Sequence, residues 1–437
     1  MSILTSKPFS KTQLISTTFI ILFTFIFLLN IPLTSNPLLP LTSHLYSLAT
    51  ATTTTTTTTT RNNTFAFTYT NETNYGPPSP SPRIHVETKS NVCDVFDGSW
   101  VYDDNGPIYK PGSCPYVGGS FNCYKSGRPD FGYLNYRWQP HACDIPRFDG
   151  KKMLEMLKGK KMVFVGDSLN RNMWESLICS LSNFNVTGTR LLIRDGFSFE
   201  IKEFECSIIM ITAPFIVKHW KTVGPTAVQT PMDKLRIDEI HDTVAKYYNA
   251  DFLIFNTGQW WNPARTKNGE NFFQEGDDFV HKKMDVEEAY TKAMNTWGEW
   301  IDNAVNKNKT KVFFVGLTAV HYKGGEWFSN GTCDKEKEPI KDAESIKGQV
   351  LEPFHPWVKN IPELAMSKMK TPVIYLNISR LTDYRKDGHP SRYRRPGSKW
   401  HPGVSQDCMH WCLPGVPDSW NQLLYATLLS SSKGSVV

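Results

Sequence analysis

Runs typical of buried strands alternate with runs typical of amphipathic helices from Asp149 onward. The expected helices cover residues 151–157, 172–181, 285–305 and 419–429, and the expected strands cover 161–165, 252–256, 311–317 and 373–376. Such alternation requires crossovers, so it predicts an α/β fold: a parallel sheet with helices on both faces. Short, continuously apolar runs such as 312–315 fit strands that are buried on both sides.

A serine lies at the turn between the strand 161–165 and the helix that follows it. Gly166, Asp167 and Ser168 form this turn, and the free N–H groups of the first helical turn point toward any negative charge that develops there. The Ser168 hydroxyl is therefore a candidate nucleophile beside oxyanion donors. The alternative is that Ser168 only caps the helix. A three-residue match is too short to decide between these two interpretations.

A carboxylate and an imidazole lie three residues apart near the C-terminus, at Asp407 and His410. A serine hydroxyl is inert until an imidazole removes its proton, and the imidazole needs a carboxylate to fix its tautomer. Ser168, His410 and Asp407 fit the roles of nucleophile, base and orienting acid. An isolated Asp-x-x-His is also compatible with a surface pair, so the hypothesis depends on both segments together.

The loops after the expected strands should share one cleft, because ligands bind outside the carboxyl ends of parallel strands. Ser168 follows one strand, Asn256 and Gly258 follow the next, and residues 318–321 follow a third. Asn256 and Gly258 are therefore expected at the oxyanion site, where the Gly258 N–H could donate without a side chain blocking approach. A simple turn is the alternative for Gly258.

Several blocks of this sequence resemble the plant trichome birefringence-like family, which belongs to the SGNH (GDSL) esterase superfamily. The resemblance rests on Trp138 and on residues 93–100 (CDVFDGSW), 127–130 (GRPD), 143–148 (CDIPRF), 166–176 (GDSLNRNMWES), 256–261 (NTGQWW), 387–391 (DGHPS) and 407–410 (DCMH). It covers the chain from residue 91 to about residue 430. So many blocks in the same order make chance similarity a poor explanation.

The resemblance implies a Golgi enzyme that places O-acetyl groups on a cell-wall polysaccharide, xylan first and pectin second. Ser168, His410 and Asp407 would be the catalytic triad, and an acetyl donor such as acetyl-CoA or another acetyl carrier would be required, with no bound cofactor. Arg171 and Asn172 are expected to bind substrate. Trp260 and Trp261 are expected to stack on sugar rings. The alternatives are a polysaccharide acetylesterase and a non-catalytic glycan-binding wall protein.

The first 90 residues do not have the composition of a packed domain. Residues 14–33 are long and apolar enough to cross a bilayer, and Lys7 and Lys11 in the tail 1–13 predict a single-pass type II anchor with a lumenal catalytic domain. A cleaved signal peptide, with small residues at 47–51, is the alternative. Residues 34–90 contain a threonine tract and a proline-rich run, which predict a disordered stalk.

Nine cysteines favour disulfides in an oxidising compartment, and the odd number leaves one unpaired or intermolecular. Residues 91–148 hold four of them and are expected to form a disulfide-tied N-terminal lobe, followed by the α/β catalytic domain over 149–437. The resemblance implies the bridges Cys93–Cys143, Cys114–Cys179, Cys123–Cys408 and Cys333–Cys412, leaving Cys206. A zinc site formed by Cys408, His410 and Cys412 is the alternative; we expect no metal.

Surface features agree with a secreted or lumenal glycan enzyme. Sequons for N-glycosylation start at Asn62, Asn71, Asn185, Asn308, Asn330 and Asn377. A formal net charge of +6 is small for 437 residues and spread along the chain, so nucleic acid is not expected as a partner. The basic run 380–399 is interpreted as a solvated loop or as the lining of a groove for an anionic glycan.

Overall fold

The structure is a computed structural model that describes residues 85–88, 91–184, 186–222, 232–324, 331–341, 356–397 and 404–432. All of the described residues belong to one compact unit within Tyr75–Val437. The predicted membrane anchor at 14–33 and nearly all of the predicted stalk lie outside the described residues. Within the described ranges, no helix has the length and apolar character that a membrane span requires.

A seven-stranded sheet forms the centre of this unit, in the order β15-β14-β11-β5-β8-β7-β6. Its strands are β5 (Lys161–Gly166), β6 (Thr189–Ile193), β7 (Gly196–Ile201), β8 (Cys206–Thr212), β11 (Phe252–Phe255), β14 (Lys311–Val315) and β15 (Val373–Leu376). The five strands from β15 to β8 run parallel, as predicted. Strands β7 and β6 add an antiparallel edge that the sequence interpretation did not include.

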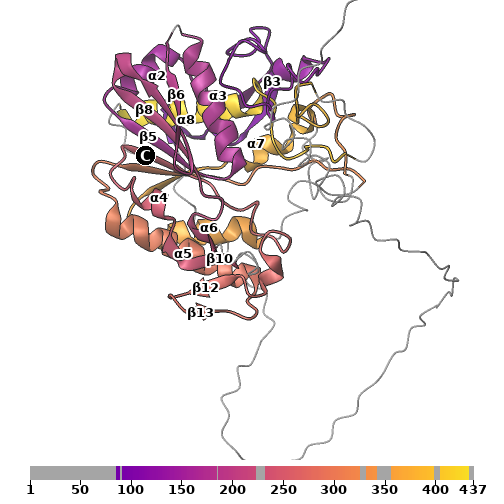
Figure 1. Ribbon diagram of the computed structural model, residues 1–437. Helices are drawn as coiled ribbons and strands as arrows, with labels where there is room; N and C mark the ends of the chain where they lie inside the picture. Colours follow the sequence, from indigo (N-terminus) through magenta and orange to yellow (C-terminus); the bar gives the residue numbers. More distant parts are fainter. Residues whose placement is uncertain are drawn as a thin grey trace, which may run out of the picture. The chain divides into compact units, whose positions relative to one another are not determined.

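Helices cover both faces of this sheet, which confirms the predicted α/β fold (Figure 1). One face packs against α2 (Gly150–Leu157), α3 (Ser168–Ser182) and α8 (Val416–Ser432). The other packs against α5 (Val286–Ala304) and α6 (Trp357–Lys368). Side chains of β5 alternate between the two cores, with Met162 and Phe164 on one side and Val163 and Val165 on the other. Burial on both faces explains the uninterrupted apolar sequence of this strand.

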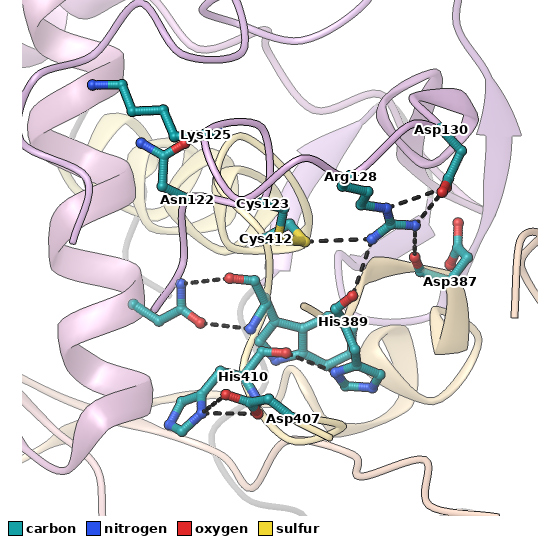
Figure 2. Close-up of a disulfide and its surroundings, with 12 residues drawn as sticks. Asn122, Cys123, Lys125, Arg128, Asp130, Asp387, His389, Asp407, His410 and Cys412 are labelled. Atoms are coloured by element: carbon teal, nitrogen blue, oxygen red, sulfur yellow. Dashed lines mark hydrogen bonds and ion pairs between the residues drawn. A yellow bond between two sulfur atoms is a disulfide. The ribbon is translucent and has the colours of Figure 1, made fainter. Parts of the chain in front are cut away.

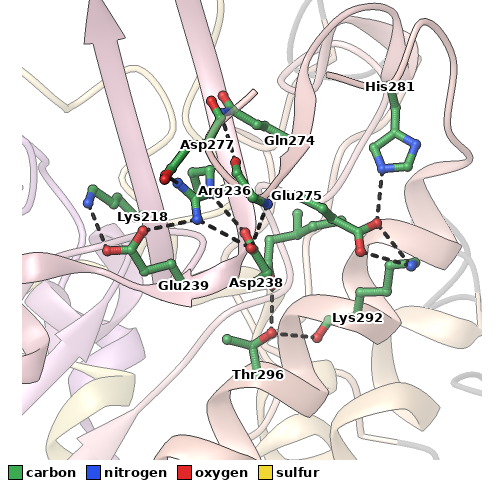
Figure 3. A network of polar contacts seen from close by, with 12 residues as sticks. Lys218, Arg236, Asp238, Glu239, Gln274, Glu275, Asp277, His281, Lys292 and Thr296 are labelled. Carbon is green, nitrogen blue, oxygen red and sulfur yellow. Dashed lines mark hydrogen bonds and ion pairs between the residues drawn. The ribbon is translucent and has the colours of Figure 1, made fainter. Parts of the chain in front are cut away.

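A smaller sheet of four strands, in the order β13-β12-β10-β9, was not predicted. Its strands are β9 (Val217–Thr222), β10 (Met232–Ile240), β12 (Phe273–Glu275) and β13 (Phe279–Val280). The sequence of β10 is rich in charge because Leu235 and Ile237 enter the core while Arg236 between them meets carboxylates. Arg236 contacts Asp238 at 2.9 Å and Asp277 at 2.9 Å (Figure 3). A charged strand of this kind gives little apolar signal.

The remaining elements are short and lie in connections. They are β1 (His85–Thr88), β2 (Asn91–Asp94), β3 (Gly98–Tyr102), η1 (Gly132–Leu134), β4 (Tyr136–Pro140), η2 (Lys202–Phe204), α4 (Asp242–Ala245), η3 (Lys267–Gly269), α7 (Ser379–Asp383) and η5 (Lys386–Gly388). Strands β3 and β4 pair antiparallel within the N-terminal segment. The Trp100 indole N–H donates to the carbonyl of Leu381 at 2.8 Å, so this segment packs directly on the α/β part.

The disulfides agree with the expected pairing in part. Cys114–Cys179 is formed as the resemblance implies, and Cys206 is free and buried. The pairs Cys123–Cys408 and Cys333–Cys412 are wrong, because the structure joins Cys123 to Cys412 and Cys333 to Cys408. Cys143 is disulfide-bonded, but the side chain of its expected partner, Cys93, is not among those described. The predicted sequons at 62, 71, 185 and 330 also lie outside the described residues.

Candidate active site

Ser168 begins α3 immediately after the turn that ends β5. Asp167, not Ser168, is the N-cap, because the Asp167 carboxylate accepts from the Leu169 N–H at 2.9 Å. The serine hydroxyl is therefore not used as a cap. Gly166 has φ of +154°, and a β-carbon there would lie 1.9 Å from Oδ1 of Asn256. Glycine allows strands β5 and β11 to bring their following loops into contact at this point.

Ser168, His410 and Asp407 form a continuous hydrogen-bonded chain, although 242 residues separate the first two. His410 Nε2 lies 2.6 Å from Ser168 Oγ, and His410 Nδ1 lies 2.8 Å from Asp407 Oδ2. Because Nδ1 donates its proton to the carboxylate, Nε2 is left as the acceptor that can take the serine proton. The Asp407 carboxylate also accepts from the backbone N–H of His410 at 3.0 Å.

Electrostatics at His410 and Asp407 stabilise the imidazolium that forms when His410 takes the Ser168 proton. Burial alone would raise the pKa of Asp407, but the neighbouring imidazolium and its hydrogen bonds lower that pKa to about 2. Burial alone would lower the pKa of His410, but the charge and hydrogen bonds of Asp407 raise it above the ordinary value. The Asp407 side chain is 2% exposed and the His410 side chain 16% exposed, so the imidazole is the part of this pair that solvent reaches.

Neighbouring groups hold the segment 407–412 by its backbone (Figure 2). His389 Nδ1 lies 2.7 Å from the carbonyl oxygen of His410. Ser391 and Asp407 exchange backbone hydrogen bonds at 2.8 and 2.9 Å. Arg128 donates to the carbonyl oxygens of Asp387 and His389, at 2.7 and 3.0 Å. The blocks 127–130 and 387–391, which carried the family resemblance without an assigned role, therefore support the base and the acid.

A second imidazole, partly buried, lies behind His389. His321, which follows β14, places Nδ1 2.7 Å from His389 Nε2. Burial lowers the pKa of both rings, to about 4 for His321 and well below the usual range for His389. Neither ring can compete with His410 as a proton acceptor near neutral pH. The sequence interpretation placed residue 321 at the cleft edge but gave these two histidines no role.

The loop after β11 adjoins the serine turn, as expected from the strand order. Asn256 and Asp167 bond reciprocally: the Asp167 N–H donates to Asn256 Oδ1 at 3.1 Å, and Asn256 Nδ2 donates to Asp167 Oδ1 at 2.9 Å. Only one amide N–H of Asn256 is then left for a substrate oxygen. Gly258 has φ of +147°, a conformation that favours glycine. Gln259 Nε2 donates to Thr318 Oγ1 at 3.1 Å, which joins this loop to the loop after β14.

Two of the four residues expected to bind substrate are buried in other roles. Asn172 is fully buried and bonds to the backbone of Trp411, so it does not face a substrate. Trp261 is 1% exposed and stacks against Phe273 in the core. Both expectations are wrong, because a helix side chain one turn past Ser168 and the second of two adjacent tryptophans both point inward. Sequence spacing alone could not separate these inward positions from cleft positions.

The other two expected substrate residues, Arg171 and Trp260, are partly exposed. Arg171 lies one turn past Ser168, its side chain is 34% exposed, and its Nε donates to the buried carboxylate of Glu175 at 2.8 Å. Trp260 is half-buried, and the guanidinium of Arg265 lies 4.4 Å from its ring centroid. The zinc alternative is wrong, since Cys408 and Cys412 both form disulfides and have no thiolate to offer.

The basic run 380–399 is neutralised wherever its contacts are described. Arg385 is buried and pairs with Asp387 at 2.9 Å. Arg380 pairs with Asp97 at 2.6 Å, and Lys386 pairs with Glu336 at 2.6 Å. The first part of the run therefore ties segments of the fold together and does not form an open cationic groove.

Comparison with known proteins agrees with this geometry. Residues 145–427 match the "GDSL/SGNH-like Acyl-Esterase family found in Pmr5 and Cas1p", and residues 91–144 match the "PMR5 N terminal Domain". The chain is 51% identical over 366 residues to Protein trichome birefringence-like 4 of Arabidopsis thaliana, covering 80% of this chain and 78% of that protein. This protein is a member of the trichome birefringence-like family. The family assignment confirms the resemblance seen in the sequence.

Other members are also similar. Protein trichome birefringence-like 1 and Protein trichome birefringence, both of Arabidopsis thaliana, are each 45% identical over 350 residues. Each match covers 77% of this chain, but only 61% and 56% of those two proteins, so the chain spans less than two thirds of their length. An acyl-esterase family, together with the serine, histidine and aspartate geometry, assigns the protein to acyl-transfer or ester-hydrolysis chemistry. Membership of the trichome birefringence-like family is consistent with polysaccharide O-acetylation in general.

Proposed function

We propose that this protein is a polysaccharide O-acetyltransferase that works through an acetyl-Ser168 intermediate. The observation that carries the proposal is the contact chain Ser168 Oγ–His410 Nε2 at 2.6 Å and His410 Nδ1–Asp407 Oδ2 at 2.8 Å, in a chain of the trichome birefringence-like family. Xylan is the first candidate acceptor and pectin the second. The acetyl donor is acetyl-CoA or another acetyl carrier.

The reaction proceeds in two displacements with one base. His410 Nε2 takes the Ser168 proton while Oγ attacks the acetyl carbonyl, and the imidazolium then protonates the departing carrier. In the second half, His410 deprotonates a sugar hydroxyl, whose oxygen attacks the carbonyl of the acetyl-serine ester. The bond between that carbonyl carbon and Ser168 Oγ then breaks, and the His410 imidazolium protonates Oγ. We assign stabilisation of the oxyanion of each tetrahedral intermediate to the backbone N–H groups of Ser168 and Gly258 and to the remaining Asn256 N–H.

Substrate contact falls to the two exposed candidates near Ser168. The Arg171 guanidinium is fixed by Glu175 through Nε, which leaves its terminal amino groups to bind a carboxylate or hydroxyl of the glycan. Trp260 offers part of its ring to a sugar, with Arg265 holding the indole in place. Both residues are at the carboxyl ends of the parallel strands, where a polysaccharide would cross the serine.

Transfer to sugar must outcompete hydrolysis, because the same triad would serve an acetylesterase. Purified protein should therefore be incubated with an acetyl donor, with and without deacetylated xylan or pectin oligosaccharides. A transferase should put most of the acetyl on the sugar and release little acetate. Equal acetate release with and without acceptor would establish the esterase instead.

The covalent intermediate has its own test. After brief exposure to the donor, mass spectrometry should find one added acetyl group on the peptide that contains Ser168 and none in Ser168→Ala. Full activity of Ser168→Ala would rule out the serine mechanism, whereas a wild-type protein that binds glycan but transfers and releases no acetyl would establish the glycan-binding alternative. Thermal unfolding of Ser168→Ala at the wild-type temperature would show that the variant is correctly folded.

We also propose a Golgi membrane location with the catalytic domain in the lumen and residues 14–33 as an uncleaved anchor. The support is the length of the apolar run and the disulfides of the folded part, which form in oxidising compartments. Protein expressed in plant cells should keep its native N-terminus and stay in carbonate-washed membranes. A soluble form that starts near residue 50 would mean that the segment is a cleaved signal peptide.

A further inference from the structure

Asn172 connects the helix that carries Ser168 to the segment that carries His410. It lies four residues after Ser168 on α3, so the two residues share a helix face one turn apart. Asn172 Oδ1 accepts from the Trp411 N–H at 2.8 Å, and Asn172 Nδ2 donates to the Trp411 carbonyl at 3.1 Å. Trp411 is the residue directly after His410. Both polar atoms of this amide therefore bond to the backbone of a single residue, Trp411.

These contacts close a small ring through the active site. The ring runs from Ser168 along one turn of α3 to Asn172, across two hydrogen bonds to Trp411, back one residue to His410, and across the 2.6 Å contact to Ser168 Oγ. Among the described residues of α3, Asn172 is the one side chain besides Ser168 that hydrogen-bonds to the segment 407–412. Other contacts hold this segment against the opposite side, including the His389 contact to the His410 carbonyl.

Burial makes this amide a rigid spacer. Asn172 and Trp411 are fully buried, so water cannot replace either hydrogen bond when the amide is lost. The two bonds also fix the amide orientation, since a carbonyl oxygen must face the Trp411 N–H and an amino group must face its carbonyl. A side chain that touches no substrate but sets the distance between nucleophile and base affects the chemical step without affecting substrate binding.

We propose that Asn172 is a positioning residue that sets the Ser168–His410 distance for proton transfer. The inference rests on the proposed role of Ser168 as nucleophile, but it does not depend on which glycan is the acceptor. A displacement of about 1 Å between reacting groups can cost about 100-fold in rate. Asn172→Ala should therefore lower kcat by roughly 100-fold with KM changed by less than about threefold.

A matched control separates an effect on the Ser168–His410 distance from the general loss of stability that follows when buried hydrogen bonds are removed. Asn421 on α8 is equally buried, and its Nδ2 also makes two bonds to α3, to the Met173 carbonyl at 2.9 Å and to Ser176 Oγ at 2.9 Å. It makes no described contact with residues 407–412. Asn421→Ala should lower the unfolding temperature comparably to Asn172→Ala yet keep kcat within about threefold of wild type.

The assays use the full chain and need no glycan. The rate at which an alkyl fluorophosphonate labels Ser168, followed by intact mass, reports the nucleophilicity of the serine directly; hydrolysis of a simple acetyl ester supplies kcat and KM. Slow labelling of Asn172→Ala with normal labelling of Asn421→Ala supports the inference. Equal labelling of the two variants overturns it, as does a rise in KM alone, which would restore the substrate-binding role. Wild-type protein that does not label at all would instead refute the proposed serine mechanism.

Asn172→Asp provides a second variant with nearly the same shape. The aspartate keeps an acceptor for the Trp411 N–H but, when ionised, cannot donate to the Trp411 carbonyl. Protonation of the carboxyl restores that donor, so the ratio of the variant rate to the wild-type rate should rise as pH falls. Because a carboxylate at position 172 would also shift the pKa of His410, that pKa is measured in each protein and the rates are compared at equal fractions of neutral imidazole. A ratio that stays flat, or falls toward acid pH, would contradict the positioning role.

Discussion

Removing the Cys123–Cys412 bridge should reduce the catalytic rate much more than removing the Cys114–Cys179 bridge, although the two losses of stability should be similar. Cys412 lies two residues after His410, and Arg128 Nη1 approaches the Cys412 sulfur at 3.3 Å, so this bridge ties the base segment to the N-terminal region. The perturbation is the double variant Cys123→Ala/Cys412→Ala. Its control is Cys114→Ala/Cys179→Ala, because Cys179 lies on α3 three turns beyond Ser168.

The expected loss of stability follows from the chain lengths that each bridge closes. Cys123 and Cys412 are 289 residues apart, and Cys114 and Cys179 are 65 residues apart. In the chain-entropy treatment these loops correspond to about 5.5 and about 4 kcal/mol at 25 °C. The bridges Cys114–Cys179 and Cys333–Cys408 shorten the longer loop to roughly 170 residues, which lowers its stabilisation only to about 5 kcal/mol because the dependence on loop length is logarithmic. The two double variants should therefore differ by only about 1 kcal/mol.

Their catalytic effects should differ much more. At a temperature where both variants are folded, loss of Cys123–Cys412 should reduce the rate of Ser168 labelling by at least about tenfold relative to loss of Cys114–Cys179, because even part of a 1 Å shift at His410 is costly. Calorimetry gives the stabilities, and peptide mapping without reduction checks the pairing. Equal labelling rates would refute the reasoning, and a mapped Cys123–Cys408 peptide would refute the pairing itself.

Three further predictions concern the triad and its surroundings. Asp407→Asn should keep the fold but lower kcat about 10³- to 10⁴-fold through the wrong His410 tautomer, whereas a loss below about tenfold would exclude that role. The acylation rate should rise as pH increases through the raised pKa of His410, because only the neutral imidazole accepts the serine proton. Ionised Asp407 should contribute about 2 kcal/mol to the free energy of unfolding above about pH 4, and this contribution is lost as pH falls through its pKa of about 2. A free energy of unfolding that stays constant between about pH 2 and 4 would contradict this. Trp261→Ala should cost about 3 to 5 kcal/mol of stability, and Trp260→Ala should mainly raise KM for glycan, so the reverse pattern would show that the two rings are wrongly assigned.

Local sequence pattern was enough to locate most strands and helices of the central sheet. The continuously apolar strands β5, β11, β14 and β15 and the periodic helices α2, α3 and α5 lie where periodicity predicted them, with ends shifted by a few residues at most for all except the start of α3. The pattern also predicted that the loops after the parallel strands lie at the same edge of the sheet, whereas the order of the strands comes from the structure. The contact between Ser168 and His410 could be anticipated for the same reason, as a nucleophile needs a base within hydrogen-bonding distance.

The side that a residue faces, and the partner nearest to it, could be learned only from the folded chain. Cys408 and Cys412 are four residues apart, so sequence could not tell which of them approaches Cys123 and which approaches Cys333. Asn172 and Trp261 stand beside the partly exposed Arg171 and Trp260, yet packing turns both into the interior. The charged strand β10 was missed because one carboxylate partner of Arg236, Asp238, adds further charge to the strand itself, while the other, Asp277, is 41 residues away in the sequence. A side chain's environment is set by the chain segments that fold around it, and the local sequence does not contain those segments.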